Sequence, residues 1–181
     1  MRIISGKFKG RRILAPKKLP VRPTTDMAKQ ALFNILNNSF YFDDISVLDL
    51  FAGTGNISFE FASRGTNQIV SVDANYGCIK FINKTAELFD MPSETIKSDV
   101  FKFLETHRGA YDIIFADPPY NFDLNAFAKI PELVFNNQLL NENGMLIIEH
   151  SKHTDLSDIQ NYRHAKSYGG NMFSFFSTNI L

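Results

Sequence analysis

The sequence predicts an α/β domain with a doubly wound, mostly parallel sheet of seven strands. Two observations support this prediction. Apolar runs typical of buried strands alternate along the chain with segments whose apolar residues recur at helical spacing, an order typical of a parallel sheet with helices on both faces. Near the end of the chain, two further β-favouring runs flank Gly169-Gly170-Asn171, which predicts an antiparallel hairpin at one edge of the sheet.

The N-terminal part is predicted to be a small basic β-hairpin, because two short β-favouring pieces lie at Arg2–Ile4 and Arg12–Leu14. A helix is then predicted to begin at Thr25 or Asp26, since either side chain can cap the first turn. The residues that follow have the spacing of one buried helical face: Ala28, Ala31, Leu32, Ile35 and Leu36. We therefore divide the chain into an arm, 1–24, and a main domain, 25–181.

The alternating part of the chain begins at residue 46. Strands are predicted over 46–51, 68–73, 95–98, 111–117 and 144–150. Helices are predicted between them, over 56–65, 75–89, 100–107 and 123–138. Pro131 interrupts the last helical segment, so either one kinked helix or two short helices are expected there.

Composition and charge narrow the class of protein. The chain has 181 residues, of which 44% are apolar, enough to bury a real core. It begins without the apolar stretch of a signal peptide, and no apolar run is long enough to span a bilayer. The four histidines and Cys78 show no metal-ligand spacing. We therefore expect a cytoplasmic protein with no metal site and no membrane partner, and nothing indicates a stable oligomer, so we expect a monomer.

The first 22 residues contain eight Lys or Arg and no acid, whereas the rest of the chain carries 11 basic and 19 acidic residues. A basic segment on an acidic body is typical of a protein that binds a polyanion. We therefore predict that this segment binds nucleic acid through the side chains of Arg2, Lys7, Lys9, Arg11, Arg12 and Arg22.

The ends of the predicted parallel strands carry the residues of a candidate site, because ligands bind there in doubly wound sheets. After the first strand, Gly53 and Gly55 allow a tight turn and a close approach of the backbone to a ligand. Asp73 ends the second strand, twenty residues after Gly53, where an acid can hold the two hydroxyls of a ribose; the alternative is a helix N-cap. Asp99 follows the third strand and can accept a hydrogen bond from an adenine amine. These groups suit an adenosine.

The fourth strand runs into Asp117-Pro118-Pro119-Tyr120. Proline has no N–H, and the residue before a proline is restricted to extended geometry. The carbonyls of this stiff segment can only accept hydrogen bonds, and Tyr120 adds a flat ring that can stack. The alternative is an ordinary turn at the end of a strand, where Asp and Pro are favoured for local reasons.

These motifs together resemble a known family. "DLFAGTGNISFE", "VDAN", "SDVF" and "FADPPY" resemble the successive motifs of class I S-adenosylmethionine-dependent methyltransferases, in which DPPY marks enzymes that methylate a nitrogen conjugated to a planar system. With "RIISGKFKGRRIL" and "RPTTDMAKQALFNIL" in front, the full chain resembles the RsmD-type bacterial 16S rRNA guanine-N2 methyltransferases. The resemblance implies a Rossmann-like methyltransferase sheet, S-adenosyl-L-methionine as cofactor, and 16S rRNA in an assembled or assembling small ribosomal subunit as partner.

The resemblance also implies roles for individual residues. The residues expected around the cofactor are Asp49, Phe51, Gly53, Gly55, Asp73, Asp99 and Asp117, and those expected to be catalytic are Asp117, Pro118 and Tyr120. Asp117 and the Pro118 carbonyl would hold the hydrogens of the guanine amine, and Tyr120 would stack on the base. The chain departs from some members at Asp73, where they carry glutamate.

Three other functions remain as alternatives. The motifs also permit a DNA or RNA adenine-N6 methyltransferase, although the chain shows no separate target-recognition domain. A catalytically silent nucleic-acid-binding subunit would not need Asp73, Asp117 and Tyr120 together. A dinucleotide-dependent oxidoreductase is disfavoured by Ser58, which stands where a third glycine is expected, and by the DPPY segment.

Overall fold

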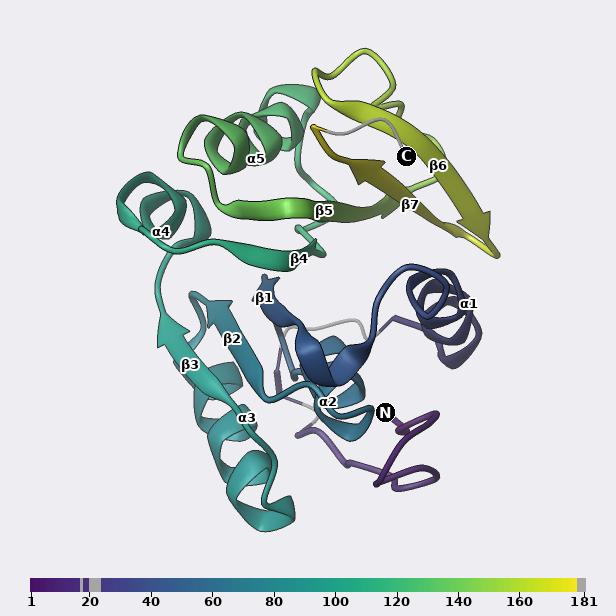
Figure 1. The fold of residues 1–181 in the computed structure, drawn as a ribbon. Coiled ribbons are helices and arrows are strands. Elements are labelled where there is room, and N and C mark those ends of the chain that lie inside the picture. Colours follow the sequence, from purple (N-terminus) through teal and green to yellow (C-terminus); the bar gives the residue numbers. More distant parts are fainter. Residues whose placement is uncertain (17, 20–23, 179–181) are drawn as a thin grey trace.

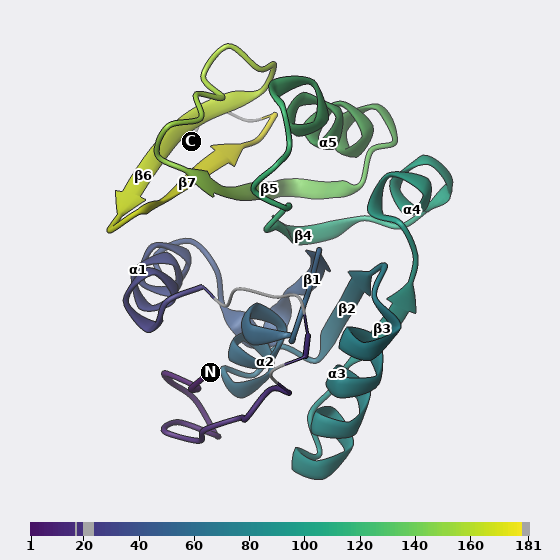
Figure 2. The same ribbon diagram turned by 180° about the vertical axis from the view of Figure 1, so that it is seen from behind.

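A computed structural model describes residues 1–16, 18–19 and 24–178, and it contains one seven-stranded sheet with helices on both faces (Figures 1 and 2). The strands lie in the order β3-β2-β1-β4-β5-β7-β6. Their bounds are β1 Ser46–Leu50, β2 Gln68–Asp73, β3 Glu94–Lys97, β4 Tyr111–Ala116, β5 Leu140–Ser151, β6 Tyr162–Tyr168 and β7 Asn171–Phe176. The first five are parallel, and β7 pairs antiparallel with both β5 and β6. The predicted fold class and the C-terminal hairpin are therefore confirmed.

The helices also lie where the periodicity predicts them. Their bounds are α1 Asp26–Leu36, α2 Asn56–Ser63, α3 Tyr76–Phe89, α4 Val100–Thr106 and α5 Leu124–Asn136. Thr25 caps α1, since its hydroxyl accepts a hydrogen bond from the Ala28 N–H at 3.2 Å. Pro131 lies inside α5, which is one continuous helix, so the alternative of two short helices is wrong. Ile130 and Val134, on either side of Pro131, are buried in the core on this face of the sheet.

The two faces of the sheet have separate cores. Helices α1, α2 and α3 cover one face and α4 and α5 cover the other (Figures 1 and 2). Side chains alternate along each strand, so Ile113 and Phe115 of β4 enter the first core while Ile114 and Ala116 enter the second. Each fully buried large apolar side chain contributes about 1.5–3 kcal/mol to folding. The alternation therefore fixes the register of β4 between the two helical layers.

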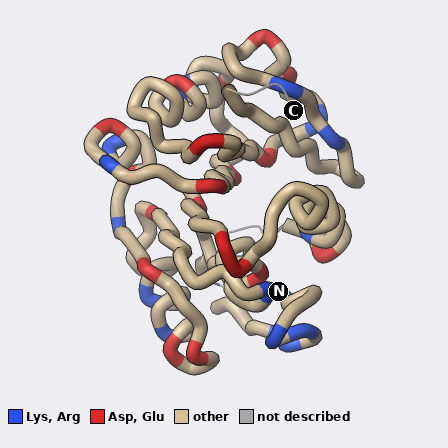
Figure 3. Tube along the Cα trace, viewed as in Figure 1, with Lys and Arg blue, Asp and Glu red and all other residues tan. Residues whose placement is uncertain are grey.

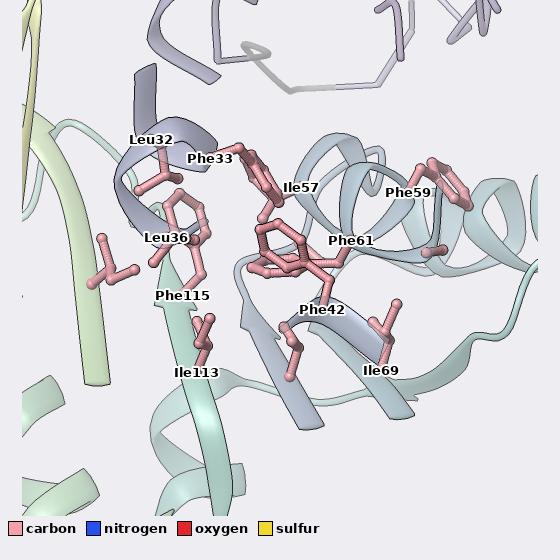
Figure 4. Close-up of a cluster of buried hydrophobic side chains, with 14 of the residues drawn as sticks. Leu32, Phe33, Leu36, Phe42, Ile57, Phe59, Phe61, Ile69, Ile113 and Phe115 are labelled. Atoms are coloured by element: carbon pink, nitrogen blue, oxygen red, sulfur yellow. The ribbon is translucent and has the colours of Figure 1, made fainter. Parts of the chain in front are cut away.

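Aromatic rings fill the first core (Figure 4). Phe33 of α1 and Phe61 of α2 meet edge to face with ring centroids 4.6 Å apart, and Phe42 lies 5.7 Å from Phe33. Arg64, just after α2, lies with its guanidinium 4.5 Å from the centroid of Phe33. This cluster joins α1 to α2 above the sheet.

The first 16 residues, here called the N-terminal segment, pack on α2 instead of forming two strands. The two halves of the segment pair antiparallel at one isolated bridge, between Arg2 and Arg12. Hydrogen bonds from the Ile3 N–H to the Arg11 carbonyl and from the Ile13 N–H to the Met1 carbonyl flank this bridge, so the predicted hairpin is present as a very short pairing. Ile3 and Ile13 are buried in the first core, at 2% and 5% exposure. The Lys7 N–H donates to the Ser63 carbonyl at 2.6 Å. The segment is thus bound to the body along its length.

Candidate active site

A cavity of about 740 Å³ lies at the carboxyl ends of β1, β2 and β4. The predicted site residues that line it are Asp49, Phe51, Gly53, Asp73, Asp99, Asp117, Pro118 and Tyr120. Parallel strands place their carboxyl ends along one edge of the sheet, which explains why residues far apart in the chain meet here. Gly55 is the one predicted cofactor residue that does not line this cavity.

The turn after β1 depends on backbone conformations that favour glycine. Gly53 and Gly55 have φ angles of +54° and +74°. A Cβ added at Gly55 would lie 3.0 Å from both the Phe59 ring and the Ile82 side chain. Phe51 has φ +57°, an uncommon conformation for a bulky residue and one that is concentrated at functional sites. Gly55 therefore serves the turn and the packing of α2, while Gly53 and Phe51 face the cavity.

The Asp73 carboxylate holds this turn in place. One oxygen accepts a hydrogen bond from the Gly53 N–H at 2.8 Å, and the other accepts from the Asn75 N–H at 2.7 Å. The N-cap of α3 is Asn75, so the helix-capping alternative for Asp73 is wrong. Asp99 does cap α4, accepting from the Lys102 N–H at 3.1 Å, while it also lines the cavity. A carboxylate has about four acceptor positions, so both acids can also bind a ligand.

Asp49 is the most buried acid in the cavity wall, at 2% exposure. Both the N–H and the hydroxyl of Ser58 donate to its carboxylate, and the Ser58 hydroxyl also lies 2.8 Å from that of Ser71. Burial raises the pKa of Asp49 to about 7, although the bonds from Ser58 oppose this. Ser58, which stands where a dinucleotide site has glycine, thus holds an acid of the cavity.

The segment after β4 forms the rim of the cavity. The Asp117 N–H donates to the Leu50 carbonyl at 3.3 Å, and the Pro119 carbonyl accepts from the Phe122 N–H at 3.1 Å, which closes a turn. Tyr120 lies in this turn and is 55% exposed. The turn therefore presents a flat ring to solvent beside the cavity, where a planar base can reach it.

Sequence reasoning missed several residues of the cavity wall. Phe122 lines the cavity, and its ring centroid lies 5.6 Å from that of Phe51 and 5.8 Å from that of Phe101. Thr24 and Asn56 line it from the side of α1 and α2. Both lie within the motifs "RPTTD" and "FAGTGN", but neither spacing nor periodicity indicates that their side chains reach the cavity.

Five of the six predicted RNA-binding residues, Arg2, Lys7, Lys9, Arg11 and Arg12, belong to the N-terminal segment and do not line this cavity. Lys and Arg gather along this segment near the N-terminus (Figure 3). Arg2 forms an ion pair with Asp26 at 3.0 Å. The Arg11 guanidinium lies 4.7 Å from the Phe89 ring centroid, and the Lys7 ammonium lies 5.2 Å from that of Phe8. Lys9 and Arg12 are exposed, and Arg22 lies outside the described residues.

No group of three or more His, Cys, Asp or Glu comes together among the described residues as a metal site would require. None of the helices in the described part of the chain combines the length and the apolar character needed to cross a bilayer.

The family model described as "Conserved hypothetical protein 95" matches residues 1–177. The Escherichia coli K12 protein named ribosomal RNA small subunit methyltransferase D is 30% identical over 82% of this chain and 71% of that protein. A hypothetical protein of Thermus thermophilus has a similar structure, with a TM-score of 0.84, 24% identity and coverage of 98% and 99% of the two chains. A T. thermophilus 16S rRNA N2 methyltransferase, solved with AdoMet and guanosine, shares the fold with a TM-score of 0.69 and 18% identity, over 89% of this chain and 45% of that one.

Proposed function

The chain belongs to the conserved hypothetical protein 95 family, and from this premise we propose that it is an S-adenosylmethionine-dependent rRNA methyltransferase. Its target is the exocyclic N2 of a guanine in 16S rRNA of the small ribosomal subunit. The observation that carries the proposal is the position of Asp117-Pro118-Pro119-Tyr120 at the rim of a cavity lined by Asp73 and Asp99. The names of the E. coli relative and of the T. thermophilus N2 methyltransferase support the same activity.

The residues of the cavity fit S-adenosylmethionine. A volume of about 740 Å³ lies within the range of about 300–1,000 Å³ that is usual for cofactor sites. Asp73 offers acceptors for the ribose hydroxyls, Asp99 offers one for the adenine amine, and Asp49 provides a negative charge for the cationic end. When bound, the cofactor supplies a methyl group on a sulfonium, which is already a good leaving group, so the proposed reaction needs no metal.

The rim residues act on the guanine. The lone pair of its exocyclic amine is delocalised into the ring, which makes this nitrogen a poor nucleophile. The Asp117 carboxylate and the Pro118 carbonyl each accept a hydrogen bond from one N–H group of the amine. These two hydrogen bonds favour a pyramidal nitrogen. Neither group has to be a strong base, because the proton can leave after the methyl group has been transferred. Tyr120 stacks on the base and orients the amine, and positioning of this kind supplies several kcal/mol, up to about 7–11.

The target base has to leave its stack to reach the rim, as in other enzymes that act on nucleobases. The N-terminal segment supports this by binding RNA phosphates through Lys7, Lys9, Arg11 and Arg12, while Arg2 already pairs with Asp26. The protein works in the cytoplasm as a monomer on an assembled or assembling small subunit. The proposed boundary between the RNA-binding arm and the catalytic domain is residue 24.

Transfer of labelled methyl groups tests the proposal. The protein is incubated with methyl-labelled S-adenosylmethionine and small ribosomal subunits, free 16S rRNA or duplex DNA, and the modified nucleoside is identified. We expect N2-methylguanosine in 16S rRNA, and transfer by Asp117→Ala that is about a hundredfold slower or more. N6-methyladenine in any substrate would favour the adenine methyltransferase, and RNA binding without transfer would favour the silent subunit.

A further inference from the structure

We propose that Lys29 is a positioning residue that couples docking of the N-terminal segment to the shape of the cavity. A buried chain of polar side chains runs from the backbone of Arg2, through the Lys29 ammonium, to Asn56 in the cavity wall. Ligand binding in the cavity and binding of the segment to the body therefore support each other. The inference rests on the proposed function, because it takes the cavity as the place where the cofactor binds.

The Lys29 ammonium is at the centre of this chain. The side chain is 1% exposed. Its nitrogen donates to the Arg2 carbonyl at 2.8 Å and to Asn56 Oδ1 at 2.8 Å, and lies 3.2 Å from Glu60 Oε2. A lysine ammonium has three N–H donors, so these three partners occupy all of them. Burial lowers the pKa of Lys29, and the charge of Glu60 opposes this.

Glu60 extends the contact to the backbone of the N-terminal segment. This side chain has no exposed surface. One carboxylate oxygen accepts from the Ile4 N–H at 2.8 Å, and the other accepts from the Ser5 N–H at 3.0 Å and from Arg64 Nε at 2.9 Å. The segment thus satisfies both charged groups, through the carbonyl of Arg2 and through two amides.

Asn56 connects this cluster to the cavity. It is the first residue of α2 and lines the cavity, and its Nδ2 donates to the Thr24 carbonyl at 3.0 Å. Thr24 also lines the cavity, and its hydroxyl donates to the buried Glu149 at 2.7 Å. Asn171 of β7 in turn donates to Glu149 at 2.6 Å. The wall on this side of the cavity is therefore held from the N-terminal segment at one end and from the sheet at the other.

The coupling follows from the cost of leaving buried polar groups unpaired. A buried charge that loses one partner remains in a medium of low dielectric constant with its desolvation uncompensated. Undocking of the segment removes one partner from Lys29 and two from Glu60. In this proposal the Lys29 ammonium then shifts to regain a partner, and its hydrogen bond to Asn56 no longer holds that side chain in one orientation. A ligand that requires the ordered wall then favours the docked segment, and by linkage the docked segment favours the ligand to the same extent.

Hydrogen exchange of the Ile4 and Ser5 amides measures this coupling directly. The probe is S-adenosylhomocysteine, with its binding followed by calorimetry in the same samples. In the wild type, we expect saturating ligand to slow exchange at both amides by about fivefold or more, the lower end of usual coupling factors. Asn56→Ala removes the connection between Lys29 and the cavity wall but keeps the ion pair of Lys29 and Glu60. In this variant, saturating ligand should slow exchange of the two amides by less than about twofold. Asn34→Ala, on the exposed face of α1, is the matched control and should behave as the wild type.

The outcomes separate this inference from the proposed function. Binding without slower exchange in the wild type would overturn the coupling alone. An undiminished slowing in Asn56→Ala, at saturating ligand, would overturn the role of this path. Absence of any binding to the wild type would overturn the proposed function and the inference with it. Lys29→Met gives a second reading: if it folds, its N-terminal amides should exchange fast with and without ligand, and ligand-induced slowing equal to that of the wild type would contradict the proposal.

Discussion

The cavity and the N-terminal segment both carry many charged residues, but they use them in opposite ways. In the cavity wall, the carboxylates of Asp49 and Asp73 accept hydrogen bonds from the backbone N–H groups of Ser58 and Gly53, and so hold the backbone that forms this wall. In the N-terminal segment, Lys9 and Arg12 are exposed, and the segment is held by Ile3, Ile13 and its own backbone. Charged residues in the sequence thus indicate a site in the first region and a solvent-facing surface in the second. The charged residues of the N-terminal segment do not indicate how the segment is attached to the body.

The largest expected effect comes from breaking that attachment. Ile3→Ala and Ile13→Ala each create a cavity in the first core, so each should lower the free energy of unfolding by about 2–5 kcal/mol. Urea denaturation measures this. Leu14→Ala is the control, because Leu14 is 87% exposed and should change stability by about 0.5 kcal/mol or less. Wild-type stability of the double variant would mean that the segment is a separable arm.

The second effect concerns the rim of the cavity. Asp117→Ala should lower the single-turnover rate of RNA methylation about a hundredfold or more, because the amine is no longer held in place. Cofactor affinity should change far less, since Asp117 is proposed to meet the base. Asp158→Ala, at an exposed position, should leave both quantities unchanged. A wild-type rate in Asp117→Ala would show that the segment after β4 is only a turn.

The third effect concerns Asp73 in the cavity wall. Asp73→Ala removes the carboxylate that we propose accepts charge-assisted hydrogen bonds from the ribose, each worth about 1.5–3 kcal/mol. The substitution should therefore weaken cofactor binding about tenfold to a hundredfold in calorimetry. The same substitution leaves the Gly53 N–H without the carboxylate to which it donates in the wild type. Asp73→Asn keeps one acceptor and should lose less affinity than Asp73→Ala. Unchanged affinity in both variants would limit Asp73 to holding the turn.

The fourth effect is a pH dependence that arises from Asp49. Its pKa, raised to about 7 by burial, means that the folded protein holds a proton that the unfolded chain releases near its usual pKa of about 4. This group therefore makes the unliganded protein less stable as the pH rises from about 4 to about 7. A cationic ligand favours the ionised form, so cofactor affinity should rise by up to about tenfold from pH 6 to pH 8. Calorimetric titrations of Asp49→Asn should show no such rise; an equal rise would assign it to another group.

The smallest effect is expected at the exposed charges. Arg12→Ala should weaken RNA binding and reduce the slope of log affinity against log salt by about one unit. Arg11→Ala should do the same and also lower the melting temperature, because Arg11 packs over Phe8 and Phe89. Filter binding over a range of salt concentrations, with thermal melting in parallel, measures both. An unchanged slope in both variants would move the RNA-binding surface away from the N-terminal segment.

The elements and the cavity could be predicted because their signals are local. Period-two and period-3.6 patterns mark the strands and helices, and parallel connections bring the strand ends together, so Asp73, Asp99 and Asp117 could be assigned to one site. Gly55 illustrates a limit of this reasoning: its positive φ was predictable, but its contact with Ile82 of α3 depends on how two helices pack.

The role of Lys29 and Glu60 could not be predicted, because it depends on contacts between residues far apart in the chain. Lys29 lies on the buried side of α1, where a lysine only interrupts the apolar pattern. The Glu60 carboxylate meets the Ile4 amide 56 residues away, and no local signal indicates this. The attachment of the N-terminal segment was missed for the same reason, since its charges dominate its composition and its two anchoring isoleucines do not.

The position of β7 has a consequence for synthesis of the protein. β7 follows β6 in the chain, yet in the sheet it lies between β5 and β6. During translation, β6 therefore leaves the ribosome before the strand that joins it to the sheet. Until Phe176 has emerged, the edge of β5 has no antiparallel partner and can template pairing with another chain. A nascent chain stalled before β7 is thus prone to aggregate, and β6 can join the sheet only after β7 has emerged.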